Sequence, residues 1–203
     1  MSSDKTGYMH CYRDREDLTK LEKAAISHYR DLTYPQMKWK WDNNRKKPRS
    51  DYYMVNNIMR DKIKRDDLTR EDKFRASWII NRVTSAINKS PVTQTFDVIR
   101  GVEMFDELRT AKVGSTIRDF AFTSFTTLPD IAAKYSRKND TDEWIVLHLT
   151  LTPQDFALYI DTEEEEWLLA GYKKFRVKHI EHRDDTPWNS GDKAIVYYLT
   201  LTT

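Results

Sequence analysis

A run of four glutamates, residues 163–166, stands directly before an apolar stretch that begins at Trp167. Short apolar stretches with large side chains are typical of a strand. If pairing begins near Glu164, strand alternation places Glu164 and Glu166 on one face and Trp167 on the other. Two carboxylates so close together require that one has a raised pKa or that a cation lies nearby. The sequence therefore predicts a rigidly held pair of carboxylates that is suited to catalysis.

Two further motifs precede this run. The first is an arginine–glycine pair, Arg100 and Gly101, at the end of a predicted strand. The second is a hydroxyl-rich strand in which Ser124 and Thr126 stand two positions apart and therefore share a face. In an alternative register, Thr123 and Ser124 are the hydroxyl pair. We prefer the first register, because it keeps a hydroxyl at both inward positions.

Several common chemistries find no support in the sequence. The five glycines build neither a dinucleotide-binding fingerprint nor a Walker-type phosphate loop. His179 and His182 stand three positions apart on a predicted strand, which puts them on opposite faces, and we predict no metal site. Cys11 is the one cysteine, so an internal disulfide is excluded.

Taken in order, the arginine, the Ser-x-Thr strand and the Glu-x-Glu run resemble the motifs of mono-ADP-ribosyltransferases of the arginine–serine–glutamate class. Their spacing is similar to that of the small ADP-ribosyltransferases of tailed bacteriophages. The resemblance covers residues 95–203. It implies an NAD-binding catalytic core of two roughly perpendicular β-sheets, which follows an N-terminal helical segment at residues 1–94. We expect the two parts to form one compact domain.

The resemblance also implies a reaction, in which NAD is cleaved between nicotinamide and ribose and ADP-ribose passes to a nucleophile. Glu166 is expected to stabilise the positive charge that develops on the ribose, much as a glycosidase carboxylate does. Ser124 is expected to hydrogen-bond Glu166, and Thr126 to support the strand. Glu164 is expected to orient and deprotonate the acceptor, because a guanidinium, whose pKa exceeds about 12, needs a carboxylate to position it.

Residues that bind NAD, the co-substrate, follow from the same resemblance, which implies no metal. Arg100 is expected to bind the phosphates, because a planar group with several donors suits them better than a lysine does. The backbone of Gly101 is expected to approach the nicotinamide amide. Tyr135, or Tyr159 before the glutamate run, is expected to stack on nicotinamide or to touch the acceptor. The full set expected at NAD is Arg100, Gly101, Ser124, Thr126, Tyr135 and Glu166.

The acceptor remains open between two classes. The Glu-x-Glu pair favours an arginine on a protein, and the phage enzymes imply host proteins as targets. A basic stretch between Lys38 and Arg49 favours RNA or DNA instead, because its cations could meet phosphates while Trp39 and Trp41 stack on bases. A third alternative is an inactive member that only binds. We rank arginine on a protein first.

The composition indicates a soluble globular protein. With 39% hydrophobic and 33% charged residues, the chain of 203 residues can build a core, which excludes a disordered class. It has no apolar run near the ~18 residues of a membrane span and no signal-peptide pattern, so we expect a cytoplasmic protein, in the host cytoplasm if phage-encoded, without a membrane partner. The charge is uneven, at +8 over residues 1–94 and −6 over residues 95–203. This suggests that the first half faces an anionic or acidic partner.

The elements that must position these residues divide the chain in two. Apolar residues at helical spacing predict one helix after Asp14, a second capped by Ser50 or Asp51, and a third after a capping box of Thr69 and Asp72. Short alternating stretches then predict closely spaced strands with few helices between them, so we expect an α+β fold with antiparallel or mixed sheets. The predicted strands cover residues 95–100, 119–125, 143–151, 156–160, 164–169, 175–180 and 194–201, with a short helix at 129–136.

Overall fold

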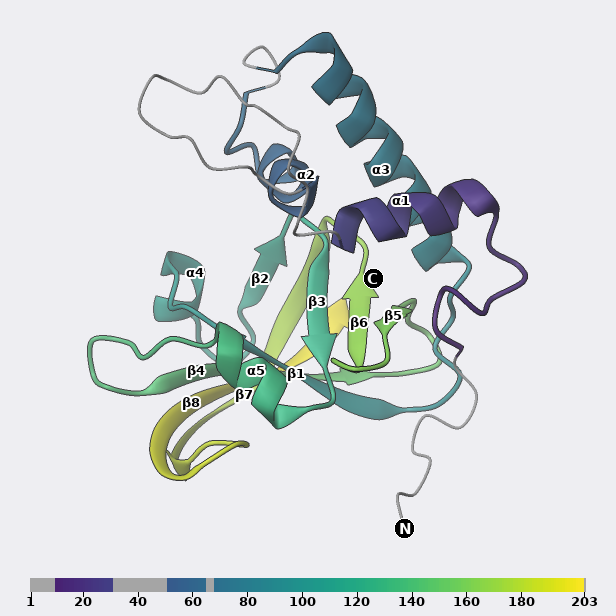
Figure 1. The fold of residues 1–203 in the computed structure, drawn as a ribbon. Helices are drawn as coiled ribbons and strands as arrows, with labels where there is room; N and C mark the ends of the chain where they lie inside the picture. The colour runs from purple at the N-terminus through teal and green to yellow at the C-terminus, as the bar shows by residue number, and fades with distance from the viewer. Residues whose placement is uncertain (1–9, 31–50, 65–67, 203) are drawn as a thin grey trace.

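The fold consists of N-terminal helices followed by a mixed β-sheet, which confirms the predicted α+β class (Figure 1). This computed structural model describes residues 10–30, 51–64 and 68–202. No helix within these ranges is long and apolar enough to cross a membrane. The helices are α1 (Lys20–Arg30), α2 (Asp51–Met59), α3 (Arg70–Asn88), α4 (Asp106–Arg109) and α5 (Pro129–Tyr135). The strands are β1 (Phe96–Val102), β2 (Thr116–Asp119), β3 (Thr123–Thr126), β4 (Trp144–Leu151), β5 (Leu158–Asp161), β6 (Glu166–Leu169), β7 (Lys173–Asp185) and β8 (Ser190–Thr202).

All eight strands in the described part of the chain belong to one sheet, in the order β2-β7-β8-β4-β1-β3-β6-β5. Strands β4 and β8 pair in parallel, and the other pairs are antiparallel. Strands β1 and β3 share a single residue pair, Ile99 with Thr126, so the sheet is narrow at that junction. Figure 1 shows β3 and β6 running across the direction of β1 and β4. Where we expected two perpendicular sheets, hydrogen bonding unites the strands in one sheet with a narrow junction.

Capping residues determine where the first and third helices begin. Thr19 and Glu22 form a capping box at the start of α1, in which Glu22 accepts from the Thr19 backbone N–H at 2.7 Å and Thr19 Oγ1 accepts from the Glu22 N–H at 3.2 Å. The predicted cap at Asp14 is therefore wrong, because this reciprocal pair satisfies the free donors five residues later. The box predicted at Thr69 is confirmed, since Thr69 Oγ1 accepts from the Asp72 N–H at 3.1 Å.

Two hydrophobic clusters lie on opposite faces of β1. The larger cluster joins the buried sides of α1, α2 and α3 to the strands and includes Val98 of β1. The smaller cluster contains Ile99 of β1, Ala132 of α5 and Val146 of β4. Because successive side chains of a strand point to opposite faces, the core that the N-terminal helices share with the sheet reaches one face of β1, and α5 packs on the other. This packing holds the strand that carries Arg100.

Strand β2 and helix α4 were missed by the sequence analysis. Strand β2 has four residues, of which only Ile117 is buried, so its alternation is too short to be recognised. Helix α4 also has four residues, and its N-cap, Phe105, offers no side-chain hydrogen bond that would mark its start. Elements of this length carry almost no periodic signal.

A buried carboxylate, Glu22, connects α1 to α3. Its side chain accepts hydrogen bonds from Ser85 Oγ at 2.6 Å and from Lys89 Nζ at 2.9 Å, in addition to those from Thr19. Burial alone would raise the pKa of Glu22, but these hydrogen bonds outweigh burial and lower the pKa to about 2. The ends of the two helices are therefore held by a carboxylate that stays ionised.

Replacing Glu22 with glutamine is expected to lower the free energy of unfolding by about 2–3 kcal/mol at neutral pH. Because the folded pKa of about 2 lies below the ordinary value of 4.5, the carboxylate stabilises the fold above pH 4.5. That contribution is lost as the pH falls from 4.5 towards 2. Urea unfolding at neutral and at acidic pH measures the difference, and the gap between the two proteins should shrink in acid. The exposed Glu16→Gln is the control, and an equal loss in both variants would contradict the role of Glu22.

Candidate active site

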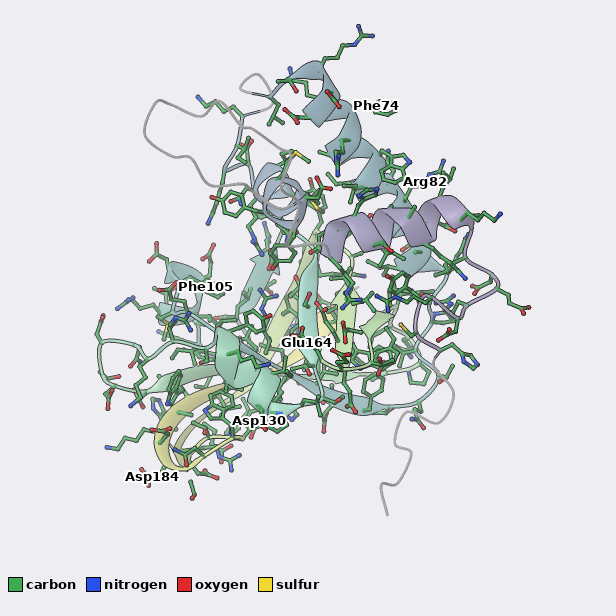
Figure 2. All side chains as sticks on the ribbon, in the orientation of Figure 1. Phe74, Arg82, Phe105, Asp130, Glu164 and Asp184 are labelled. Carbon is green, nitrogen blue, oxygen red and sulfur yellow. The ribbon has the colours of Figure 1, made fainter. Side chains whose placement is uncertain are left out.

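The glutamate run is a turn that leads into β6. Strand β6 begins at Glu166, whereas Glu164 and Glu165 lie in the turn that follows β5. Glu165 has a φ of +42°, in the left-handed region that is uncommon for residues other than glycine. The predicted strand alternation from Glu164 is therefore wrong, because the chain is still turning there. Figure 2 labels Glu164 between the end of α1 and helix α5.

Two side chains hold the backbone of this turn. Asp161, the last residue of β5, accepts hydrogen bonds through Oδ1 from the N–H groups of Glu163 and Glu164, at 2.7 and 2.9 Å. Thr126, the last residue of β3, donates from Oγ1 to the Glu164 carbonyl oxygen at 2.6 Å and accepts from the Leu128 N–H at 2.9 Å. The peptide groups on both sides of the Glu164 side chain are thus fixed, and Thr126 acts on the turn as well as on its own strand.

Pairing between β3 and β6 sets which residues face Glu166. Thr126 lies opposite Glu166, and Ser124 lies opposite Leu168. Residues directly opposite one another in an antiparallel pair share a face, so Ser124, Thr126 and Glu166 point the same way. Thr123 points to the other face and is buried there. The hydroxyl pair beside Glu166 is therefore Ser124 and Thr126.

The Ser124 hydroxyl is buried, and no partner among the described residues hydrogen-bonds it with ordinary geometry. It lowers the pKa of the Glu166 carboxyl, which lies on the same face of the sheet. A buried hydroxyl without a partner is costly. Ser124 is therefore a position where a polar group of a bound molecule fits.

Arg100 and Gly101 occupy the end of β1. Arg100 is half-buried and donates from Nη1 to the Ser124 carbonyl oxygen at 3.4 Å. At Gly101, a Cβ atom would lie 2.1 Å from the Ala132 carbonyl oxygen and 2.7 Å from Ser136 Cβ. Only glycine lets α5 pack this closely on β1. This glycine therefore has a packing role within the protein, and its approach to nicotinamide stays a prediction.

Glu166 is a desolvated carboxyl with cations beside it. Burial raises the pKa of Glu166 and the charge of Glu164 raises it further, while the Ser124 hydroxyl and the guanidinium groups of Arg30 and Arg100 lower it; the net shift is upward. The charge of Glu164 thus acts on Glu166 even though Glu164 lies in the turn and not on the strand. A carboxylate in such surroundings can stabilise positive charge that develops nearby.

The two predicted aromatic contacts have different surroundings. Tyr135, at the end of α5, is 58% exposed. Partial burial raises the pKa of its hydroxyl, and the charges of Glu164 and Glu166 raise it further. Tyr159 is buried, with its ring centroid 4.7 Å from that of Trp167. The prediction for Tyr159 is wrong, because β5 points this ring into the core.

Sequence reasoning missed three residues of this region. Arg30, the last residue of α1, forms an ion pair with Asp161, and its charge lowers the pKa of Glu166. The ring centroid of Tyr52 of α2 lies 5.2 Å from that of Tyr29, and Tyr52 contributes to the raised pKa of Tyr135. These residues come from elements far apart in the chain, and no spacing rule links them.

Other features bear less directly on this region. The basic stretch between Lys38 and Arg49 lies outside the described residues, so its role with nucleic acid stays a prediction. In the described ranges, no group of three or more His, Cys, Asp or Glu is placed to hold a metal ion. A cavity of about 310 Å³ is lined by residues that include Met104, His182 and Tyr197, and by none of the predicted site residues. We take the carboxylate pair, and not this cavity, as the candidate site.

No family model matches the sequence, and no curated protein matches it. Solved structures do match. The ADP-ribosyltransferase Vis from Vibrio splendidus, in complex with the M6 inhibitor, has a TM-score of 0.64 at 19% identity over 92% of this chain and 75% of Vis. The chain has an ADP-ribosyltransferase-like fold. Plx2a, an ADP-ribosyltransferase toxin from Paenibacillus larvae, has a TM-score of 0.57 at 13% identity over 92% of this chain and 88% of that toxin.

The enzymatic component C2-I of the C2 toxin from Clostridium botulinum has a TM-score of 0.63 at 16% identity. The match covers 92% of this chain and 44% of C2-I. At these identities the similarity concerns the fold, and the structures compared are bacterial toxins. The similarity to phage enzymes and the arginine–serine–glutamate class stay predictions.

Replacing Thr126 with valine is expected to lower the free energy of unfolding by about 1–3 kcal/mol, because the Glu164 carbonyl and the Leu128 N–H each lose a partner. Replacement with serine keeps the hydroxyl and should cost clearly less. Urea unfolding of both variants measures the difference. If valine and serine cost the same, the hydroxyl does not hold the glutamate turn.

Proposed function

We propose that this protein is a mono-ADP-ribosyltransferase that cleaves NAD and transfers ADP-ribose to an arginine side chain of a protein. The observation that supports this most is the placement of the half-buried Glu166 carboxyl, which lies on the strand next to Ser124, with Arg100 bonded to the Ser124 carbonyl oxygen and Glu164 in the turn that leads into β6. The ADP-ribosyltransferase-like fold supports the reaction class.

The residues present fit NAD as a co-substrate. The Ser124 hydroxyl is a buried polar atom without a standard hydrogen bond, and Arg100 offers a guanidinium that suits phosphate. Exoenzyme S from Pseudomonas aeruginosa, with a TM-score of 0.52 at 15% identity over 73% of this chain and 66% of that chain, was solved bound to carba-NAD. NAD supplies a ribose whose bond to nicotinamide breaks, with nicotinamide as the leaving group.

Glu166 and Ser124 act on the ribose side of this reaction. The Glu166 carboxylate provides fixed negative charge in a desolvated position, where electrostatic stabilisation is larger than in water. The Ser124 hydroxyl faces the same side of the sheet as Glu166, where it can bond the ribose or the carboxylate. Arg100, on the neighbouring strand, provides the positive charge for the phosphates. These residues lie on three neighbouring strands, β1, β3 and β6.

Glu164 acts on the acceptor side. Its carboxylate can accept hydrogen bonds from a guanidinium and can take the proton that the acceptor nitrogen loses. The Vis transferase was also solved in complex with agmatine, with a TM-score of 0.61 at 20% identity over 93% of this chain and 77% of that chain. Agmatine carries a guanidinium group, so this complex favours arginine as the acceptor for the present chain.

Replacing Glu166 with glutamine is expected to reduce nicotinamide release from NAD on the order of 10²–10³-fold, because the fixed negative charge is lost. The wild-type rate should fall as the pH decreases through a value above 4.5, since the pKa of Glu166 is raised from that value and the carboxyl must be ionised to act. Nicotinamide release measured across pH tests both statements. Glu163→Gln, at an exposed neighbouring position, should retain the wild-type rate.

Replacing Glu164 with glutamine is expected to separate the two halves of the reaction. Hydrolysis of NAD should continue, whereas ADP-ribosylation of agmatine should fall about a hundredfold or more, because the acceptor loses its carboxylate partner. Both products are measured in one assay by chromatography. Equal loss of both activities would show that Glu164 does not act on the acceptor.

Labelled NAD incubated with the protein and a bacterial lysate tests the acceptor class. Label that is lost on protease treatment supports a protein acceptor. Label that survives protease and is lost on nuclease treatment would overturn it in favour of nucleic acid. Wild-type protein that releases no nicotinamide in any of these mixtures would falsify the enzymatic assignment and leave a binding module.

A further inference from the structure

One ion pair joins the N-terminal helices to the glutamate turn. Arg30, the last residue of α1, pairs with Asp161, the last residue of β5. The two side chains are 22% and 13% exposed, respectively. Fully exposed pairs are worth about 0–1 kcal/mol, whereas a largely shielded pair is less screened by water and salt. The attraction between Arg30 and Asp161 is therefore stronger than that of a pair on the open surface.

Asp161 uses its two oxygens for different purposes. Oδ1 accepts the N–H groups of Glu163 and Glu164, at 2.7 and 2.9 Å, and Oδ2 faces Arg30. The carboxylate thus caps the turn with one atom while the other atom is held by α1. Without Arg30, the Asp161 carboxylate could still accept the two N–H groups, but it would lose the cation that orients it.

The charge of Arg30 also lowers the pKa of Glu166 and so opposes the effect of burial on that carboxyl. The guanidinium is therefore paired with the carboxylate that caps the turn, and its charge acts on the carboxylate that begins β6. The charged and titratable groups that face Glu166 are Arg30 and Tyr29 from α1, Arg100 from β1, Glu164 from the turn and Tyr135 from α5.

We propose that Arg30 is a positioning residue for the reaction: through its ion pair with Asp161 it holds the glutamate turn that leads directly to Glu166. This inference rests on the proposed function and extends the active site into the N-terminal helical segment. The contribution of that segment is then electrostatic as well as structural.

A second ion pair between the two halves of the chain provides a matched control. Arg60, which directly follows α2, forms two hydrogen bonds with Asp119 of β2, at 3.1 and 2.9 Å, and the two side chains are 28% and 22% exposed. Its burial is similar to that of the Arg30 pair, but it is not among the groups that face Glu166. Loss of either pair should lower stability to a similar extent.

The variants Arg30→Gln, Arg30→Lys and Asp161→Asn are compared with Arg60→Gln. Asparagine keeps an oxygen that can cap the turn but removes the charge. For nicotinamide release, Arg30→Gln and Asp161→Asn should lower kcat about tenfold to a hundredfold with KM for NAD changed less than about twofold, because the turn is misplaced while NAD contacts remain. Arg30→Lys should recover part of kcat. The acid limb of the pH–rate profile should move to higher pH in Arg30→Gln and stay in place in Arg60→Gln.

A carboxyl titration without NAD separates this inference from the proposed function. The pKa of Glu166, followed by NMR with ¹³C-labelled glutamate, should be higher in Arg30→Gln than in wild type and in Arg60→Gln. If wild type does not cleave NAD but this difference is present, the proposed function fails and the link between α1 and the turn stands. If Arg30→Gln matches Arg60→Gln in kcat, acid limb and Glu166 pKa, the inference is overturned whatever the activity of the wild type.

Discussion

The proposed active site depends on keeping a carboxylate charged while it is partly removed from water. Burial disfavours the ionised form of Glu166, and the charge of Glu164 adds to that effect. Guanidinium groups from two separate elements, Arg30 on α1 and Arg100 on β1, offset part of it. Each guanidinium group is held by its own element and not by Glu166. The packing of α1 and of β1 therefore determines whether both cations act on this carboxylate.

The sequence predicted the parts of the site that lie on strands better than those that lie in turns. Ser124 and Thr126 share a face because a strand has a fixed period of two, and β3 keeps that period. Glu164 lies in a turn, where Glu165 adopts a left-handed conformation that no alternation pattern anticipates. Arg30 could not be found at all, since its effect on Glu166 results from the packing of α1 against the strands, which no local pattern specifies.

At the level of the fold, helix and strand order was predictable because most elements are long enough to show their period. The capping box at Thr69 could be predicted because its two partners, Thr69 and Asp72, are only three residues apart in the sequence. The single residue pair between β1 and β3 could not be predicted, because pairing between residues far apart in the chain produces no local sequence pattern. The uneven charge predicts an anionic or acidic partner for the first half of the chain. Arg30–Asp161 and Arg60–Asp119 are ion pairs between the two halves, so part of this charge is paired within the chain.

The narrow junction between β1 and β3 has a mechanical consequence for the site. Arg100 lies on one side of it, and Ser124 and Glu166 lie on the other. Few backbone hydrogen bonds resist a change in the angle between the two parts of the sheet, and the contact from Arg100 to the Ser124 carbonyl spans the junction. The distance from the guanidinium to the carboxylate is thus an adjustable dimension of this fold. Substitutions in the packing of α5 on β1 can alter it without touching either charged group.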